Sequence, residues 1–362
     1  MQKKLGIFLI AALGLLILPL IAQQAGNAWV RILDVALLYM LLALGLNIVV
    51  GYAGLLDLGY VAFYAVGAYM FGLLASPQLT DTFPNIHAMF LAGLHAPIWV
   101  VIPLGAIVAG TFGVLLGAPT LKLRGDYLAI VTLGFGEIIR VFLNNLDSPV
   151  NITNGPKGIA QIDSIKFFGF NMGKSHDVFG LFTLNSVSMY YYMFLTLVVI
   201  SVVICYRLQD SRIGRAWMAI REDEIAAKAM GINTRNLKLA AFGMGATFGG
   251  VSGVMFASFQ GFISPESFSL QESVMIVAMV VLGGIGHIPG VILGALLLSA
   301  LPEVLRYVAG PLQAMSGGRL DAAILRQLLI ALAMIIVMLM RPRGLWPQPE
   351  HGKAAPIPAP AK

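Results

Sequence analysis

Ionisable side chains within long apolar stretches are the first candidates for chemistry in this sequence. Glu137 and Arg140 stand three residues apart in one such stretch. A charge in lipid is costly, so intramembrane ionisable residues usually form ion pairs or mark transport pathways. A spacing of three places both side chains on one face of a helix, where they can neutralise each other. A structural ion pair and a direct role in transport both remain open.

A second candidate, Asp57, lies in a glycine-rich break between two apolar stretches. Broken helices near the middle of a membrane commonly line a permeation path. Asn47, Tyr60 and Tyr64 could line the same path, although packing in the core is the alternative for the two tyrosines. A carboxylate at this position could also couple transport to an ion gradient.

The stretch 207–237 carries a different kind of signal. Its acidic residues Glu222, Asp223 and Glu224 suit a helix N-terminus, where unpaired N–H groups favour negative charge. Gly231 suits the left-handed position that ends a helix. The short helix between them has an apolar face available, made by Ile225, Ala226, Ala229 and Met230. The stretch is long for a simple connection, which favours a docking element over a solvated connector.

The sequence contains no complete motif of a nucleotide-binding or hydrolytic enzyme. The string from Gly169 to Gly173-Lys174-Ser175 is one residue short of a phosphate-binding loop. Cys205 is the single cysteine, and the five histidines are scattered. The sequence therefore predicts no enzyme, metal site or cofactor of its own. If transport is energised by ATP, hydrolysis must occur on another chain.

Composition shows what must position these residues. Of 362 residues, 58% are hydrophobic and 11% are charged, against about a quarter charged in soluble domains. The net charge is +6, but the basic residues cluster between apolar runs and form no nucleic-acid-binding face. We expect an all-α, polytopic transmembrane bundle in contact with lipid.

About ten apolar stretches could cross a hydrocarbon core of roughly 30 Å as helices. They are 5–22, 29–50, 58–75, 98–117, 126–143, 188–206, 238–259, 272–284, 289–308 and 323–341. The first is longer than the apolar region of a typical signal peptide, which favours a retained span. The course of 272–308 stays open between a tight hairpin and a broken helix.

Lys and Arg residues set the predicted orientation. They are frequent in 207–237 and present at the N-terminus and in the tail, whereas 76–97 has none. Basic loops stay inside, so both termini are expected in the cytoplasm and 144–187 outside. The predicted organisation is an N-terminal helix and turn (1–28), a transmembrane domain (29–346) and a disordered Pro/Ala-rich tail (347–362).

Small residues recur at every fourth position on two predicted helices. One row is Gly105, Ala109, Gly113 and Gly117; the other is Ala241, Gly245, Gly249, Gly253 and Ala257. Small residues let helices approach closely in lipid. The rows therefore predict a compact bundle.

Four stretches, in order, resemble the LivM-type permeases of branched-chain amino-acid ABC importers. They are Gly45 to Tyr69, Asp126 to Arg140, Gly214 to Gly231, and Ser264 to Phe268 followed by Gly283-Gly284-Ile285-Gly286. The resemblance implies that the third stretch contains a coupling helix seated on an ATPase. The residues implied for this role are Gly214, Arg215, Arg221, Glu222, Asp223, Glu224, Ala226, Ala227 and Gly231. Asp57 departs from the family pattern, in which this position is more often small or apolar.

The resemblance also implies partners and a location. These are a second related permease, two ATP-binding subunits and a periplasmic amino-acid-binding protein, assembled at the bacterial inner membrane. Residues 151–158 resemble a family stretch that could contact the binding protein, with an ordinary turn as the alternative. The expected function is import of Leu, Ile and Val. An ion-coupled secondary transporter, or a family member for urea or other amino acids, are the alternatives.

Overall fold

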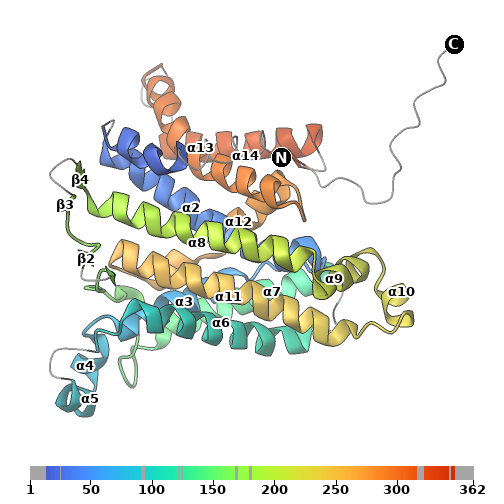
Figure 1. Cartoon of the computed structure of the whole chain (residues 1–362), viewed down its shortest axis with the longest axis horizontal. Coiled ribbons are helices and arrows are strands. Elements are labelled where there is room, and N and C mark those ends of the chain that lie inside the picture. Colours follow the sequence, from blue (N-terminus) through green and yellow to red (C-terminus); the bar gives the residue numbers. More distant parts are fainter. Residues whose placement is uncertain are drawn as a thin grey trace.

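The computed structural model describes residues 14–24, 26–90, 94–120, 123, 125–167, 170–178, 182–315, 322–341 and 344–346. The start of the predicted span 5–22 and the predicted tail 347–362 lie outside the described residues. Within the described part, long helices lie side by side along one direction (Figure 1). Their bounds are α2 Asn27–Asn47, α3 Val61–Leu74, α6 Ile98–Thr120, α7 Asp126–Asn145, α8 Ser186–Gln209, α11 Thr234–Gln260, α12 Leu270–Gly283, α13 Ile288–Met315 and α14 Ala322–Met340.

The helices fall close to the predicted apolar stretches, but the count of about ten spans is not confirmed. Six described helical segments are long and apolar enough to cross a membrane: Asn27–Tyr52, Ile98–Thr120, Ser186–Gln209, Thr234–Gln260, Pro265–Gly283 and Ile288–Leu305. Three shorter apolar helices are Gly14–Gln24, Val61–Leu74 and Ile330–Met340. α7 is 20 residues long but is not among these six segments.

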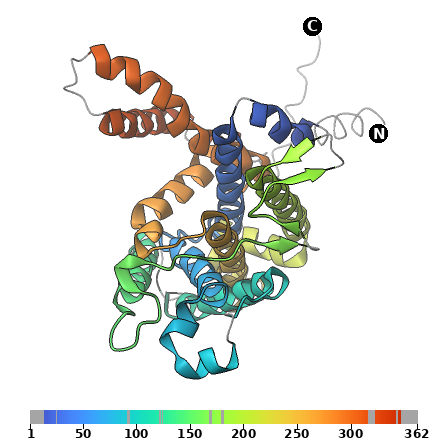
Figure 2. The ribbon, with the colours of Figure 1, turned by 90° about the vertical axis from the view of Figure 1, so that its left-hand side faces the viewer.

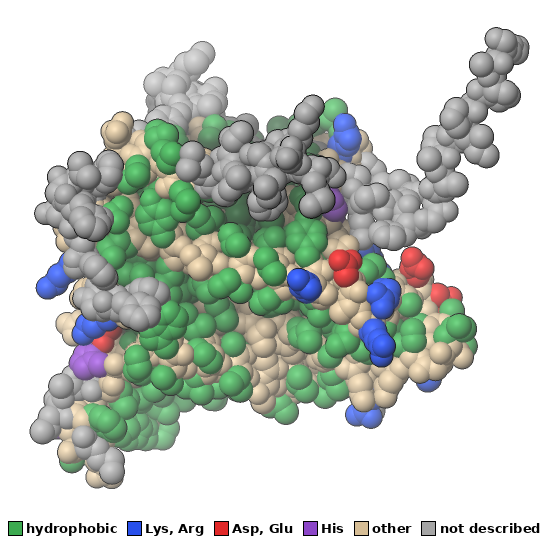
Figure 3. All heavy atoms as spheres, viewed as in Figure 1, with side chains coloured by type: hydrophobic (Ala, Val, Ile, Leu, Met, Phe, Trp, Pro, Cys, Tyr) green, Lys and Arg blue, Asp and Glu red, His purple; other side chains and the backbone are tan. Residues whose placement is uncertain are grey.

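Short elements gather at the two ends of the bundle. One end, the α9–α10 end, carries α9 Arg212–Glu222 and α10 Glu224–Ala229. The other, the hairpin end, carries α4 Gln78–Thr82, α5 Pro84–Met89, and two antiparallel pairs, β1 Lys166–Phe167 with β2 Phe170–Asn171 and β3 His176–Val178 with β4 Phe182–Leu184. The strands lie in the predicted outward loop, so the described fold is helical but not purely so. A broad apolar surface separates the two ends in the space-filling view (Figure 3).

The predicted rows of small residues do bring helices together, with α11 at the centre. A Cβ on Gly113 of α6 would lie 2.5 Å from the Cβ of Ala246. A Cβ on Gly245 of α11 would lie 3.1 Å from the carbonyl oxygen of Gly45 on α2. The α6 row thus packs against α11, whereas the α11 row faces α2 and α3. Small residues on several faces of one helix let three neighbours approach it closely.

The region 272–308 forms a tight helical hairpin. α12 and α13 are joined by a turn at residues 284–287, and a Cβ on Gly294 would lie 2.2 Å from the carbonyl oxygen of Met279. After α14 the chain returns to this turn, where the Leu345 N–H donates to the carbonyl of Leu282 at 2.8 Å. Viewed end-on, α14 and the later part of α13 project from the rest of the bundle (Figure 2), whereas the first half of α13 is packed in the core through Val291, Ala295 and Leu298.

Candidate functional site

The first candidate region is the break between α2 and α3. α2 continues into a π-helical segment, η1 Ile48–Tyr52, and the chain then leaves helical structure until α3 begins at Val61. Wider π turns are rare and often occur at functional sites. Gly54 has φ +69°, a conformation that glycine adopts without strain. The glycine-rich stretch therefore breaks the helix, as the sequence predicts.

Asp57 is buried in this break. One of its carboxylate oxygens accepts the N–H of Gly59 at 2.9 Å, and the other has no partner among the described residues. The adjacent Leu58 N–H donates to the hydroxyl of Thr132 on α7 at 3.0 Å. Asp57 and Thr132 also line one small pocket, together with Gly59, Phe63, Leu116, Gly117, Phe135 and Phe242. The pocket has apolar walls with one incompletely bonded carboxylate.

The other residues predicted for the path, Asn47, Tyr60 and Tyr64, each contact a different part of the bundle. Asn47 is fully buried, and its side-chain oxygen accepts the N–H of Gly286 at 2.9 Å. The Tyr60 hydroxyl donates to the carbonyl of Gly245 at 3.0 Å. Tyr64 lies against Phe256 and Phe268, with ring centroids 5.2 and 5.1 Å away. In this structure Asn47 and the two tyrosines hold neighbouring elements together, whereas Asp57 lines the small pocket described above.

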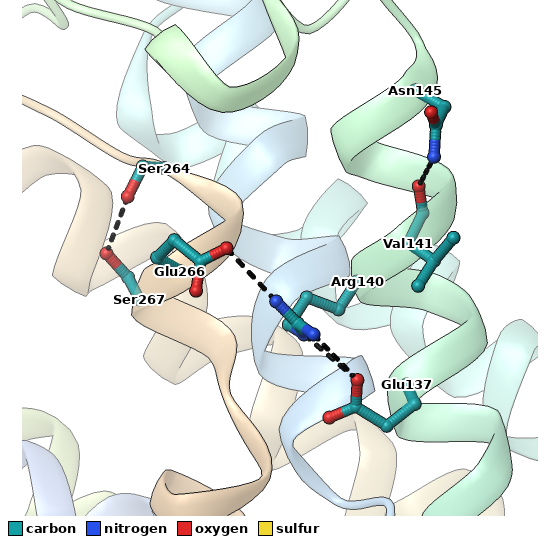
Figure 4. Close-up of polar contacts among 7 residues, drawn as sticks. All are labelled: Glu137, Arg140, Val141, Asn145, Ser264, Glu266 and Ser267. Carbon is teal, nitrogen blue, oxygen red and sulfur yellow. Dashed lines mark hydrogen bonds and ion pairs between the residues drawn. The ribbon is translucent and has the colours of Figure 1, made fainter.

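Glu137 and Arg140 pair with each other, and a third residue joins them (Figure 4). The Nε of Arg140 donates to Glu137 at 3.0 Å, and its Nη1 donates to Glu266 at 3.0 Å. Glu266 belongs to the 3₁₀ turn η3 Pro265–Phe268, so the trio ties α7 to the segment before α12. Two carboxylates share one guanidinium, which leaves this cluster one negative charge in excess.

The second candidate region is the pair of short helices α9 and α10. The Ser211 hydroxyl accepts the N–H of Gly214 at 3.1 Å and caps α9. Asp223 caps α10 by accepting the N–H groups of Ile225 and Ala226 at 2.8 and 3.1 Å. Gly231, with φ +82°, follows the end of α10. The acidic start and glycine stop predicted from the sequence are thus present, and α9 adds a helix before them.

The residues implied for ATPase coupling divide between two directions. Gly214 and Ala227 are buried, whereas Arg215, Arg221, Glu222, Asp223, Ala226 and Gly231 are exposed. The carboxylate of Glu224 pairs with Lys238 at 2.7 Å. Ile225 and Met230 are 70% and 83% exposed. The end of α10 therefore presents an exposed apolar tip, and the ion pair between Glu224 and Lys238 attaches α10 to α11.

Arg221 points back toward the bundle. Its Nη1 donates to the carbonyl of Gly51 at 2.5 Å. Partial burial lowers the pKa of Arg221 from its usual value, but a guanidinium remains charged at any physiological pH. The two candidate regions are consequently in direct contact.

Some polar residues were missing from the sequence-based candidates. Asp34 lies within α2, is fully buried, and neither carboxylate oxygen has a partner in the part of the chain that is described. Glu272 of α12 accepts a hydrogen bond from Tyr39 at 2.7 Å. Both are acidic residues inside apolar stretches, so the cost of burying charge could have identified them. Glu266 gave no such signal, because it lies in the turn before α12 and outside the predicted apolar stretch 272–284.

The segment 151–158 forms a turn beside α7. The Asn151 side-chain oxygen accepts the N–H of Asn154 at 2.8 Å, and the Thr153 hydroxyl donates to the carbonyl of Leu143 at 2.7 Å. The turn lies at the hairpin end, opposite α10 (Figure 1). No cluster of three or more metal-binding side chains occurs among the residues described.

Comparison with known proteins identifies the family of this chain. Residues 28–338 match the family described as the branched-chain amino acid transport system / permease component. The chain belongs to this family. It is 40% identical to the high-affinity branched-chain amino acid transport system permease protein LivM of Escherichia coli (strain K12), over 95% of this chain and 75% of that protein. No solved structure gives a significant match.

More distant relatives include a second kind of permease. The permease protein LivH of Salmonella typhimurium is 26% identical over 87% of this chain and 93% of its own length. A probable LivM of Methanocaldococcus jannaschii is 26% identical over 86% of this chain and 91% of its own. The predicted resemblance is confirmed, and the chain is a multi-pass membrane permease subunit related to both kinds.

Proposed function

We propose that this chain is the membrane subunit of an ATP-binding cassette importer that moves Leu, Ile and Val into the cytoplasm. The observation that carries the proposal is the family match over residues 28–338, together with an exposed, capped helix at one end of the bundle. The chain pairs with a second, related permease in the inner membrane. Two ATP-binding subunits bind and hydrolyse ATP, so this chain needs no cofactor.

The α9–α10 end faces the cytoplasm in this proposal. The basic residues of 207–237 support that orientation, as does the view in which Lys and Arg gather near α9 and α10 (Figure 3). Both termini are then cytoplasmic, and the hairpin end faces outward, where the turn 151–158 is positioned to meet a periplasmic amino-acid-binding protein. Substrate affinity would reside mainly in that protein, which agrees with the sparse polar lining of the Asp57 pocket.

α10 is the contact for the ATP-binding subunits. Ala226 is exposed on it, next to the apolar tip. We expect Ala226→Trp to release the ATP-binding subunits while the membrane domain remains folded. The matched control is Ala88→Trp, because Ala88 is an exposed alanine on the short helix α5 at the opposite end. Co-purification from detergent extracts measures the effect, and equal loss in both variants contradicts this assignment.

The energy source distinguishes the proposed ATP-driven importer from an ion-coupled secondary transporter. The complete complex in proteoliposomes should accumulate leucine when ATP and the binding protein are supplied, and an ionophore that collapses ion gradients should not stop uptake. Carboxylates such as Asp57 could otherwise serve ion coupling. Leucine uptake by the isolated chain, driven by a proton or sodium gradient alone, would refute the proposal.

Substrate range is tested in the same vesicles. Competition by Ile and Val against labelled leucine is expected, because branched apolar side chains of similar size should share one path. Competition by urea, or by polar amino acids alone, would assign the chain to another substrate class within the same family.

A further inference from the structure

Arg221 makes the direct link between α9 and the helix break. Its Nη1 reaches the carbonyl oxygen of Gly51 at 2.5 Å, across 170 positions in the sequence. Its aliphatic stem also packs on Gly54, where an added Cβ would lie 2.8 Å from Cγ and 3.2 Å from Cβ of Arg221. The end of α9 therefore rests on the backbone of the segment 51–54.

The accepting carbonyl belongs to the end of a helix. Gly51 lies in the last turn of the continuous helix formed by α2 and η1, which ends at Tyr52. The last carbonyls of a helix lack partners within the helix and carry the negative end of its dipole. A guanidinium at this place satisfies a carbonyl and complements that dipole. Arg221 thus caps the C-terminus of the helix that precedes Asp57.

The same helix end is held from a second side. A Cβ on Gly51 would lie 2.1 Å from the Asn47 side-chain oxygen and 2.8 Å from the backbone nitrogen of Gly286. That oxygen in turn accepts the Gly286 N–H at 2.9 Å. Three segments therefore pack closely around Gly51: the end of η1, the turn between α12 and α13, and α9.

α9 and α10 are fastened to the start of α11 on their other side. The fully buried indole of Trp217 donates to the carbonyl of Leu237 at 2.7 Å. The ammonium of Lys238, whose side chain is 7% exposed, pairs with Glu224 of α10. The two short helices and the first turn of α11 are joined by several bonds. A displacement of α10 is therefore expected to move α9 as well.

We propose that Arg221 is a positioning residue that transmits movement of α9 and α10 to the end of the α2–η1 helix and so to the break that holds Asp57. This proposal rests on the proposed function, in which α10 receives the force of the ATP-binding subunits. It separates two roles within one segment. α10 contacts the ATP-binding subunits, and Arg221 contacts the end of the helix that precedes Asp57.

The test measures leucine uptake and ATP hydrolysis in the same proteoliposomes of the complete transporter with its binding protein. Arg221→Met removes the donor and the charge but keeps a stem of similar shape. We expect the ATP-binding subunits to stay bound, hydrolysis to continue, and leucine transported per ATP to fall by about ten-fold, a size typical of coupling between sites. Arg221→Lys, which retains a charged donor, should recover part of this ratio.

Arg212→Met is the matched control. Arg212 is an exposed arginine at the first position of the same helix, at the opposite end from Arg221. Its replacement removes the same charge without touching Gly51, so the transport ratio should stay at the wild-type value. An equal fall in both variants would show a general effect of charge and overturn the inference.

The remaining outcomes distinguish the inference from the proposed function. Wild-type coupling in Arg221→Met overturns the inference but leaves the proposed function intact, whereas wild-type uptake without ATP overturns the function itself. Loss of the ATP-binding subunits from Arg221→Met makes the residue a docking contact, which also overturns the inference. If that variant does not fold, Arg221→Gln decides, because it removes the charge and shortens the side chain that reaches Gly51: a lowered ratio supports the inference, and an unchanged ratio overturns it.

Discussion

The crossing of α3 and α11 offers a strict test of the packing. Gly67 on α3 faces Gly250 on α11, and an added Cβ at Gly67 would lie 2.0 Å from the carbonyl oxygen of Gly250. The same Cβ would lie 2.6 Å from both the carbonyl carbon and the Cα of Gly250. All three neighbours are backbone atoms of a helix, so they cannot rotate away as a flexible side chain can. Gly67→Ala must therefore move one helix.

The size of the effect follows from these distances. Ordinary van der Waals contact begins near 3.4 Å, so the helices must separate by roughly 1.4 Å at the crossing, the difference from 2.0 Å. Overpacking of this kind usually costs about 1–3 kcal/mol. Because the obstacle is backbone, we expect Gly67→Ala to lower the free energy of unfolding by about 3 kcal/mol, the upper end of that range. Lipid is as apolar as the interface and cannot drive the helices back together.

The assay is unfolding of the purified protein in mixed micelles, followed by circular dichroism as the fraction of SDS increases. Gly134→Ala is the control, because Gly134 is inside α7 and an added Cβ there would meet nothing within 4 Å. Alanine is the better helix former by about 0.8–1 kcal/mol, so this variant should be as stable as wild type or more so. A wild-type transition for Gly67→Ala, or equal losses in both variants, would refute the reasoning.

Three further predictions use the same preparation. Trp217→Phe loses the hydrogen bond to Leu237 but keeps an aromatic ring, so stability should fall by about 1–2 kcal/mol and amide exchange in α9 should rise. Arg140→Gln should cost more than Glu266→Gln at low salt in denaturation experiments, since the side chain of Glu266 is 66% exposed and such ion pairs contribute about 0–1 kcal/mol. The thiol of Cys205, 1% exposed, should react with a water-soluble maleimide much more slowly in the folded protein than in SDS.

The sequence predicted the helices well because lipid imposes a simple rule. Every backbone group in the hydrocarbon must be bonded, so long apolar runs form helices, and α2, α6, α8 and α11 follow the predicted stretches closely. The two short hairpins escaped prediction because strands of two or three residues leave no alternating pattern to detect. Length alone also could not settle the number of spans, since α3 has 14 residues and reaches only part of the way across.

The candidate site was predicted less completely, for a geometric reason. Helical spacing showed that Glu137 could reach Arg140, but sequence spacing says nothing about Glu266, which arrives from a turn 126 residues away. Capping signals are local, and so the start of α10 at Asp223 could be predicted from the sequence. The orientation of Arg221 is not local, because it depends on where a distant helix ends.

The break at Asp223 explains how one segment can face two ways. Asp223 has φ −154° and ψ 110°, an extended conformation between two helices, so the directions of α9 and α10 are set independently. If the two had been one continuous helix, the 3.6-residue period would fix the angle between the tip of α10 and Arg221. With the break, Arg221, although an exposed residue, bonds to the carbonyl of Gly51, while Ile225 and Met230 form the exposed apolar tip beyond it. If ATP-binding subunits bind α10, they can move only those parts of the bundle to which α10 is attached. In the described residues those attachments lead through Lys238 to α11 and through Arg221 to the helix that precedes Asp57.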